Sequence, residues 1–520
     1  MKGRSFFCRA LGSWRGLRWV ALAAVAPALW ACNARSLDAP SVIPRSSALQ
    51  DFQETQNRQL DLLFMIDNSS SMDTAQANLK ANMASFMDVL KGIPGGLPDL
   101  HIAVVSSDLG AGLGDGSIQG CGSDVSPQGD AGLFHYQPTG GCAATGLDPN
   151  ATYLVDSGGS NPITNFGTQD ITTVFQCITS LGGSGCGFEH QLASVARALG
   201  ADGAPAPAPN QGFLRDDADL GIVLLTNEDD CSAPPGTPLF TQISNDINST
   251  YGPLENFLCN EWGHVCLDPT DNTYKPPARH APNDLVTDTV TYSAAGGPNN
   301  CKSREDSPVM TPVGRIAEGI KALKQDGSQI FVATLAGPSV PYTVGWRDSG
   351  TQPPQLWPEI AHACGSDAAA TSFADPAVRI QQFVDEFGDN GLTDTFCQAS
   401  YGPSLGTIAN KLDADIVPKC ISGNVAHKPG DPDTLDCTVT RLSPNPGDRN
   451  HPIQSVVSMC DGGHTVTPCW VLAPPAGAQP CNGVVVTVDD GGNTPPGNTK
   501  TQVNCSICVP GYPDPDIGCN

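Results

Sequence analysis

Three side chains that carry oxygen, Asp67, Ser69 and Ser71, follow at alternate positions directly after the apolar run of residues 60–66. A nearly continuous apolar run predicts a buried parallel strand, and open α/β sheets bind ligands at the carboxyl ends of such strands. One carboxylate and two hydroxyls are hard oxygen ligands, which suit Mg²⁺ or Ca²⁺ when water or a partner's oxygen completes the shell. The loop therefore predicts a divalent metal site. The alternative is that Asp67 and the serines only cap the next helix and close a turn.

Strand and helix patterns alternate along residues 58–414, which we expect to form one large domain. Leu79, Met83, Phe86 and Leu90 recur at helical spacing after the first strand. Further strands are predicted at residues 101–106, 220–226 and 330–335, with an edge strand at 370–373, and further helices at residues 172–180, 192–199, 313–323, 380–387 and 405–412. Alternating elements with apolar strands predict an α/β fold with a Rossmann-like, mostly parallel sheet and helices on both faces.

In this setting the loop resembles the metal-ion-dependent adhesion site of von Willebrand factor A domains. The resemblance covers residues 59–412, and Asp67, Ser69 and Ser71 match the family's first three ligand positions one by one. It implies a von Willebrand factor A-like domain that binds Mg²⁺ or Ca²⁺ and uses the ion to capture a protein or another anionic ligand.

Two other positions of the family's site differ in this chain. The family has an Asp after its fourth strand, where this chain has Asn227 followed by Glu228, and we expect both to serve as metal ligands. Asn227 keeps an oxygen donor without the charge, which Glu228 or Asp229 can supply. The family also has a Thr before its third helix. The chain has none there, and Ser184 or Glu189 is the candidate replacement.

Long segments rich in glycine, proline and cysteine interrupt and follow the alternating array. The interruptions lie at about residues 108–168 and 231–307, and we expect them to be insertions stapled by disulfides. From residue 415 to residue 520 the chain has eight cysteines among glycine, proline and β-branched residues. This last segment predicts a small cysteine-rich β module.

The N-terminus has the pattern of a signal peptide over residues 1–31. Five basic residues without an acidic one precede a short apolar stretch, residues 19–31. A transmembrane helix needs roughly 20 apolar residues. The chain has 20 cysteines, and 18 of them follow Cys32. An even, dense set of cysteines in an exported chain predicts disulfides, whose pairing the sequence does not determine.

The four residues Leu29, Trp30, Ala31 and Cys32 resemble the lipobox of bacterial lipoproteins. The resemblance implies cleavage before Cys32, acylation of that cysteine, and a lipidated N-terminal tether over residues 32–57. The residue after the cysteine is Asn33, which in Gram-negative lipoproteins implies the outer membrane. The alternative is ordinary cleavage after residue 28, which leaves Cys32 as an odd thiol.

Composition and missing motifs argue against other classes of function. A formal charge of −26 argues against nucleic-acid binding, which needs a basic surface. The sequence has no H-E-x-x-H motif and no Walker motif. Cys505 and Cys508 are spaced as C-x-x-C, but proline and glycine follow them instead of a helix, which favours a structural role.

We therefore expect no enzyme. The predicted function is that of an exported, membrane-anchored binding or adhesion protein, which contacts the membrane through its lipid alone. The alternative is a structural or assembly lipoprotein of the cell envelope that needs no metal. A hydrolase is the least favoured class, because it would need a site hidden in the two insertions.

Overall fold

The structure is a computed structural model. It describes residues 46–53, 59–93, 97–111, 118, 121, 128–136, 146–158, 162–216, 218–242, 244–324, 327–365, 372–416, 421–443, 452–461, 466–473, 483–491, 500–511 and 513–519. The predicted signal peptide, Cys32 and Asn33 lie outside these residues. Within the described residues, no helix is both long and apolar enough to cross a membrane.

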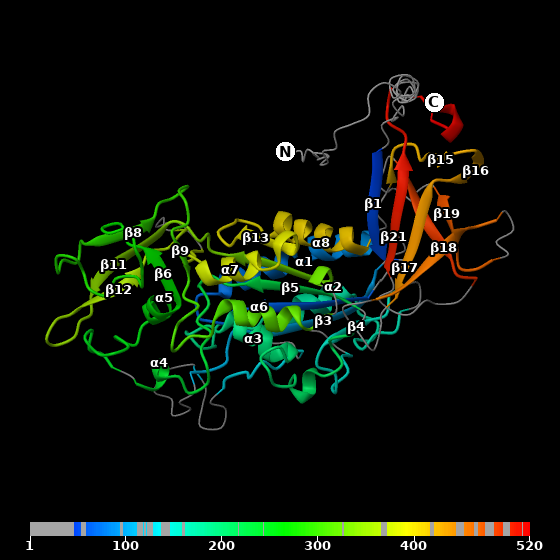
Figure 1. Cartoon of the computed structure of the whole chain (residues 1–520). Coiled ribbons are helices and arrows are strands. Elements are labelled where there is room, and N and C mark those ends of the chain that lie inside the picture. The colour runs from blue at the N-terminus through cyan, green and yellow to red at the C-terminus, as the bar shows by residue number, and fades with distance from the viewer. Residues whose placement is uncertain are drawn as a thin grey trace, which may run out of the picture. The chain divides into compact units, whose positions relative to one another are not determined.

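A six-stranded, mostly parallel sheet forms the centre of the α/β part of the chain (Figure 1). Its strands in chain order are β2 (Gln59–Ile66), β3 (Asp99–Ser106), β4 (Leu154–Asp156), β5 (Asp219–Leu225), β10 (Ile330–Ala336) and β13 (Gly391–Thr395). The spatial order is β13-β10-β5-β2-β3-β4, and only β4 runs antiparallel to its neighbour. Numbered along the chain from β2, this is the doubly wound order 3-2-1-4-5-6. The predicted mixed α/β fold with a mostly parallel sheet is confirmed.

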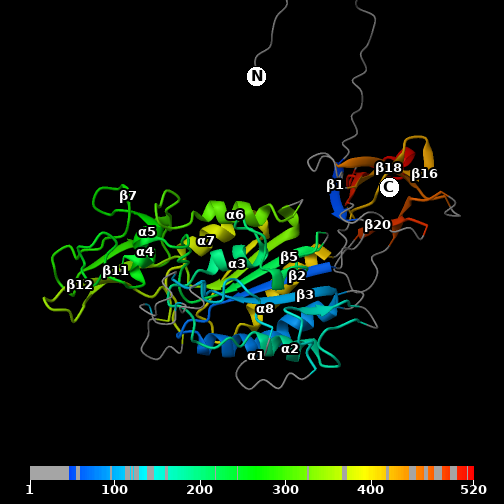
Figure 2. The same cartoon turned by 90° about the horizontal axis from the view of Figure 1, so that it is seen from below.

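Helices cover both faces of this sheet (Figure 2). On one face lie α1 (Asp73–Gly92), α2 (Ile171–Ile178) and α8 (Gly402–Ile416), and on the other lie α3 (Gln191–Leu199), α6 (Val313–Lys321) and α7 (Val378–Asp385). Side chains of a strand alternate between the two faces. Leu62 and Phe64 accordingly pack with α1, whereas Leu63 and Met65 pack with α3. This two-sided burial explains why the β2 sequence is apolar at almost every position.

The edge strand was placed wrongly by the sequence pattern. Ser372 and Phe373, the described part of the predicted strand, lie outside any strand. The edge strand is instead β13, which pairs in parallel with β10. Its sequence, GLTDT, contains only one large apolar residue, Leu392, because an edge strand is less buried than a central one. An apolar run therefore could not reveal it.

The second predicted insertion is a folded lobe, which Figure 1 shows in green at one end of the sheet. It contains α4 (Pro238–Thr241), α5 (Phe257–Gly263), β6 (His264–Leu267), β7 (Tyr274–Lys275), β8 (Thr289–Ser293) and β9 (Cys301–Ser303). Two later strands, β11 (Tyr342–Asp348) and β12 (Leu356–Ile360), join β8 in an antiparallel sheet. The predicted stapling is confirmed here by the disulfides Cys231–Cys259 and Cys266–Cys301.

The C-terminal part of the chain is built of strands. A seven-stranded sheet has the order β1 (Ser46–Gln53), β21 (Lys500–Ile507), β17 (Cys437–Ser443), β18 (Ile453–Met459), β19 (Cys469–Ala473), β20 (Gly483–Asp489) and β14 (Ile421–Ser422). Ser46–Gln53, a part of the predicted tether, thus forms a strand of this sheet. Disulfides Cys437–Cys505 and Cys460–Cys469 cross-link it.

A small second unit comprises the described residues of 46–47, 424–436 and 506–519. It holds β15 (His427–Lys428), β16 (Asp431–Leu435) and the short 3₁₀ helix η4 (Pro515–Ile517). Disulfide Cys508–Cys519 and the buried side chains of Ala426 and Ile517 form its core. Three other 3₁₀ helices lie in the α/β part: η1 (Ala208–Asn210), η2 (Gly327–Gln329) and η3 (Gly388–Asn390).

Candidate metal centre

The predicted metal loop lies at the carboxyl end of β2, beside the end of β5. The Asp67 N–H donates to the Leu225 carbonyl oxygen over 2.9 Å, and the Thr226 N–H donates to the Leu335 carbonyl oxygen over 3.2 Å. The strand order of the sheet reverses between β2 and β5. Doubly wound sheets bind ligands at this reversal point, outside the carboxyl ends of the strands. The fold therefore places the loop where a ligand site is expected.

Asp67 is fully buried, and hydrogen bonds fix both of its carboxylate oxygens. Oδ1 accepts from the Ser69 N–H over 2.8 Å and from Ser107 Oγ over 3.2 Å. Oδ2 accepts from Thr226 Oγ1 over 2.7 Å. Burial raises the pKa of the Asp67 carboxyl, and the hydrogen bond from Ser69 offsets part of that rise. The carboxylate is thus held in one orientation by three donors from three separate loops.

Three other predicted ligands form a chain of contacts beside Asp67. Ser69 Oγ lies 3.2 Å from Ser71 Oγ, and Ser71 Oγ donates to Asn227 Oδ1 over 3.1 Å. Ser69 and Asn227 are buried, whereas Ser71 is exposed. The structure therefore brings four of the five predicted ligands together, although Asn227 stands 156 positions after Ser71. The exposed hydroxyl opens this cluster of oxygens to solvent.

The helix-capping alternative for the loop does not match the start of α1. The residue before α1 is Met72, and no side chain caps the helix there. Asp67 instead accepts from the Ser69 N–H two positions later, and the Ser69 carbonyl accepts from the Met72 N–H over 3.1 Å. Asp67 and Ser69 thus close a turn, as the alternative holds, but neither caps α1.

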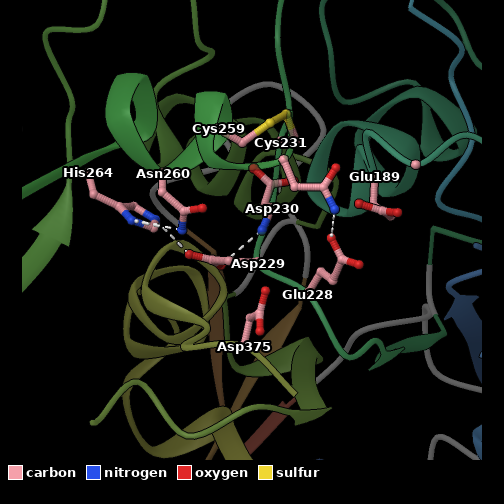
Figure 3. Close-up of a pocket in the computed structure, with 11 residues that line it drawn as sticks. Glu189, Glu228, Asp229, Asp230, Cys231, Cys259, Asn260, His264 and Asp375 are labelled. Atoms are coloured by element: carbon pink, nitrogen blue, oxygen red, sulfur yellow. Dashed lines mark hydrogen bonds and ion pairs between the residues drawn. A yellow bond between two sulfur atoms is a disulfide. The ribbon is translucent and has the colours of Figure 1, made fainter. Parts of the chain in front are cut away.

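Glu228, the fifth predicted ligand, lies in the wall of a pocket of about 20 Å³ with Glu189 and Asp375 (Figure 3). The Asn256 amide donates to Glu228 Oε2 over 2.8 Å. A volume of this size admits about one water-sized particle. Glu189 is buried, and its Oε1 has no hydrogen-bond partner among the described residues. Ser184, the other candidate replacement for the family's Thr, is exposed.

Glu189 and Glu228 are neighbouring carboxyl groups. Burial, together with the charges of Asp375 and Asp67, raises the pKa of Glu228 to about 8. Burial and the charges of Glu228 and Asp67 raise the pKa of Glu189 well above its ordinary value. The two groups share a hydrogen bond, and such a pair titrates as a unit. A cation bound beside these carboxyl groups would favour their charged forms and lower both pKa values.

A glutamine on α1 holds the loop of residues 182–185 against the metal loop. Gln76 Nε2 donates to the carbonyl oxygens of Asp67 and Gly182, each over 2.9 Å, and its Oε1 accepts from the Gly182 N–H over 2.9 Å. The Gly185 N–H donates to the Asn68 carbonyl over 2.8 Å. One hydrogen bond thus joins the two loops directly, and three more connect them through Gln76. The close approach leaves little room at Gly185.

Replacing Gly185 with Ala is expected to destabilise the protein by roughly 1–3 kcal/mol, the usual cost of overpacking. A Cβ atom at Gly185 would lie 2.2 Å from Asn68 Oδ1, so the buried Asn68 side chain or the loop must move. Gly187→Ala is the matched control, because a Cβ there would meet nothing within 4 Å. Urea unfolding of both variants measures the difference, and equal midpoints for the two would contradict the close approach.

Asp229 is the other candidate source of negative charge for the ion. Its carboxylate is occupied by hydrogen bonds to His264 and to the start of α7. Its Oδ2 lies 2.7 Å from His264 Nε2 (Figure 3) and accepts from the Val378 and Arg379 N–H groups at the start of α7. Burial alone would raise the pKa of Asp229, but the hydrogen bond and charge of His264 lower it below its ordinary value. Tyr342 OH completes this buried chain, 2.8 Å from His264 Nδ1. These contacts give Asp229 a structural role, which connects the lobe to α7.

The residues at the loop fit a hard divalent cation in their chemistry. A carboxylate, two hydroxyls and an amide oxygen are the donor types that Mg²⁺ and Ca²⁺ prefer, and the Glu189 Oε1 is a buried acceptor without a partner among the described residues. Within the part of the chain that the structure describes, no three His, Cys, Asp or Glu side chains form a metal-binding group by themselves. Hydroxyl and amide oxygens would therefore have to supply much of the shell.

Comparisons with known proteins give little further guidance. No family model and no curated protein sequence matches the chain. Among solved structures, the pilus adhesin RrgA of Streptococcus pneumoniae is similar over 89% of this chain at 11% identity and a TM-score of 0.26, and the chain covers 58% of that adhesin. Three N-terminal domains of the type V pilus tip protein Mfa5 of Porphyromonas gingivalis match 89% of this chain and are covered to 68%, at 11% identity and a TM-score of 0.25. Likenesses this weak carry no conclusion about this chain.

Proposed function

We propose that this chain is an exported binding or adhesion protein whose von Willebrand factor A-like domain captures a partner through a divalent ion. The ion, Mg²⁺ or Ca²⁺, is bound by Asp67, Ser69, Ser71 and Asn227, with the Glu228 and Glu189 carboxylates beside them. The observation that carries the proposal is the contact between Ser69, Ser71 and Asn227 at the point where the strand order reverses.

The charge of the chain supports an ion as the link to the partner. In a protein with a formal charge of −26, a bound cation would offset the repulsion of an acidic ligand. The exposed Ser71 hydroxyl marks the side of the cluster on which the partner's oxygen would complete the shell. A carboxylate of a partner protein is the ligand we propose, because it replaces a water with a charged, hard oxygen donor.

Export and anchoring are proposed from the N-terminal sequence. Lipidation of Cys32 would tether the protein to the outer membrane, and multiple acyl chains give stable anchoring where a single chain gives marginal binding. The seven disulfides between described cysteines agree with an oxidising compartment. We propose no catalytic activity for the site.

One observation favours the alternative of a metal-independent assembly protein. The Asp67 carboxylate already accepts three hydrogen bonds, and Ser71 already donates to Asn227. A loop satisfied in this way can be purely structural. In that case partner binding would not depend on a divalent ion.

Binding to immobilised poly-L-glutamate in the presence and absence of EDTA separates the two proposals. The ion-dependent proposal predicts binding in Mg²⁺ or Ca²⁺ that is lost with EDTA and in the Asp67→Ala variant. Poly-L-glutamine is the matched surface without carboxylates and is expected to bind nothing. Equal binding to poly-L-glutamate with and without EDTA would contradict capture through an ion.

A further inference from the structure

A cavity of about 830 Å³ lies between α3, α6 and the loops of residues 109–111 and 233–236. It is separate from the metal loop, because none of Asp67, Ser69, Ser71 and Asn227 lines it. Pockets for small molecules generally measure about 300–1,000 Å³ and have mostly apolar walls. The cavity falls within that range.

The cavity is hollow because small residues face it from both helices. Ala193 and Ala196 line it on α3, and Gly319 lines it on α6. A side chain at Gly319 is excluded on other grounds, since a Cβ there would lie 2.1 Å from the Ala201 carbonyl oxygen. Phe240 and Ile316 add larger apolar surface to the wall. The packing of α3 on α6 therefore leaves an apolar space that no side chain of the described residues fills.

One buried polar group in this wall lacks a partner. His190 is 3% exposed, and its Nδ1 accepts from the Ala233 N–H over 3.4 Å. A neutral imidazole with Nδ1 as acceptor carries its proton on Nε2. The Gly110 backbone makes a hydrogen-bonding contact with the ring, but among the described residues no atom lies in full hydrogen-bond geometry with Nε2.

A cation at the cavity is also without an ionic partner. Arg315 lines the cavity and is exposed, and no ion pair joins it to another residue that the structure describes. Arg197, the other arginine of the wall, pairs with Asp202 over 2.7 Å. The Arg315 guanidinium is thus available to an anion. An arginine without an ionic partner is unusual in a chain with 27 basic and 53 acidic residues.

We propose that this cavity binds a small apolar molecule that carries an anionic oxygen group. The apolar body would lie between α3 and α6, the anionic group would pair with Arg315, and an oxygen would accept from His190. An amphiphilic carboxylate or sulfonate has this combination of features.

Fluorescence titration with two matched dyes tests this proposal on the purified, oxidised chain. 1-Anilinonaphthalene-8-sulfonate has an apolar body with a sulfonate, and N-phenyl-1-naphthylamine has the same body without it. Both dyes are expected to bind at one saturable site. Arg315→Gln is expected to weaken the sulfonate dye about fivefold, the effect of one exposed ion pair, and to leave the neutral dye unchanged.

A second variant fills the cavity. Ala193→Phe is expected to weaken both dyes by about tenfold or more, whereas Leu285→Ser, on an exposed apolar side chain outside the cavity, leaves both unchanged. Binding that does not saturate, that persists in Ala193→Phe, or that falls equally for both dyes in Arg315→Gln overturns the proposal. If Ala193→Phe does not fold, the comparison of the two dyes in Arg315→Gln still tests the proposal, because replacing an exposed residue leaves the fold intact. Asp67→Ala leaves dye binding intact, so the result is independent of the metal site.

Discussion

Replacing Arg379 with Met is expected to lower the free energy of unfolding by about 3–5 kcal/mol, the cost of removing one partner from a buried ion pair. Arg379 is fully buried, and its Nη2 and Nε lie 2.9 Å and 3.1 Å from Asp230 Oδ2. The guanidinium also donates to the Thr311 carbonyl over 2.7 Å and to Ser303 Oγ over 3.1 Å. Met fills a similar volume but leaves Asp230 as a buried charge without a counter-charge.

The effect is expected to be large because Asp230 connects several elements. Its Oδ1 accepts from the Leu192 N–H at the start of α3 over 2.9 Å and from Ser232 Oγ over 2.6 Å. Arg379 is the second residue of α7, and Ser303 ends β9 in the lobe. The pair therefore fixes α3, α7 and the lobe to the end of β5.

Urea unfolding of Arg379→Met, with Arg347→Met as control, measures this cost. Arg347 also pairs with glutamates, but its side chain is 39% exposed, and exposed pairs contribute about 0–1 kcal/mol. The double variant Arg379→Met with Asp230→Asn is expected to recover part of the loss, because it removes the stranded charge. A loss in Arg379→Met no larger than that in Arg347→Met would contradict the structural role of the pair.

The central sheet could be predicted because its strands are buried on both faces. In β2, β5 and β10 nearly every side chain is buried, so each strand reads as an apolar run. The helix α1 could be predicted for the same reason, because Leu79, Met83 and Phe86 mark its buried stripe. By contrast β13 has partly buried residues at most positions and left no such signal.

The metal loop could be predicted only in part. Asp67, Ser69 and Ser71 are neighbours in sequence, so their spacing was visible, and the resemblance pointed to Asn227 and Glu228 at the end of the matching strand. The contact of Ser71 with Asn227 depends on the pairing of β2 with β5.

Contacts between distant segments had no signal in a single sequence. His264 and Asp229 meet across 35 positions, and Tyr342 joins His264 across 78. The disulfide Cys121–Cys186 spans 65 positions. An even number of cysteines predicts disulfides but does not show which cysteines pair. The structural role of Asp229 therefore became visible only with the fold, whereas the sequence had left it as a candidate source of charge for the ion.

Isothermal titration of Mg²⁺, Ca²⁺ and Mn²⁺ into the purified, oxidised chain measures whether the loop at Asp67 binds a divalent ion. Asp67→Ala and Ser71→Ala are the variants, and Asp88→Ala, an exposed acidic residue of α1, is the control for loss of charge alone. Asp67 is fully buried, so its replacement can also disturb the fold. Ser71 is exposed, so weaker ion binding in Ser71→Ala reports the loss of the ligand itself.

The unaltered chain and Asp88→Ala are expected to bind about one divalent ion saturably. Asp67→Ala is expected to abolish this binding, and Ser71→Ala to weaken it by about tenfold, as expected for loss of one metal ligand. Saturable binding that is unchanged in Asp67→Ala, or no binding by the unaltered chain, would contradict a metal centre at this loop.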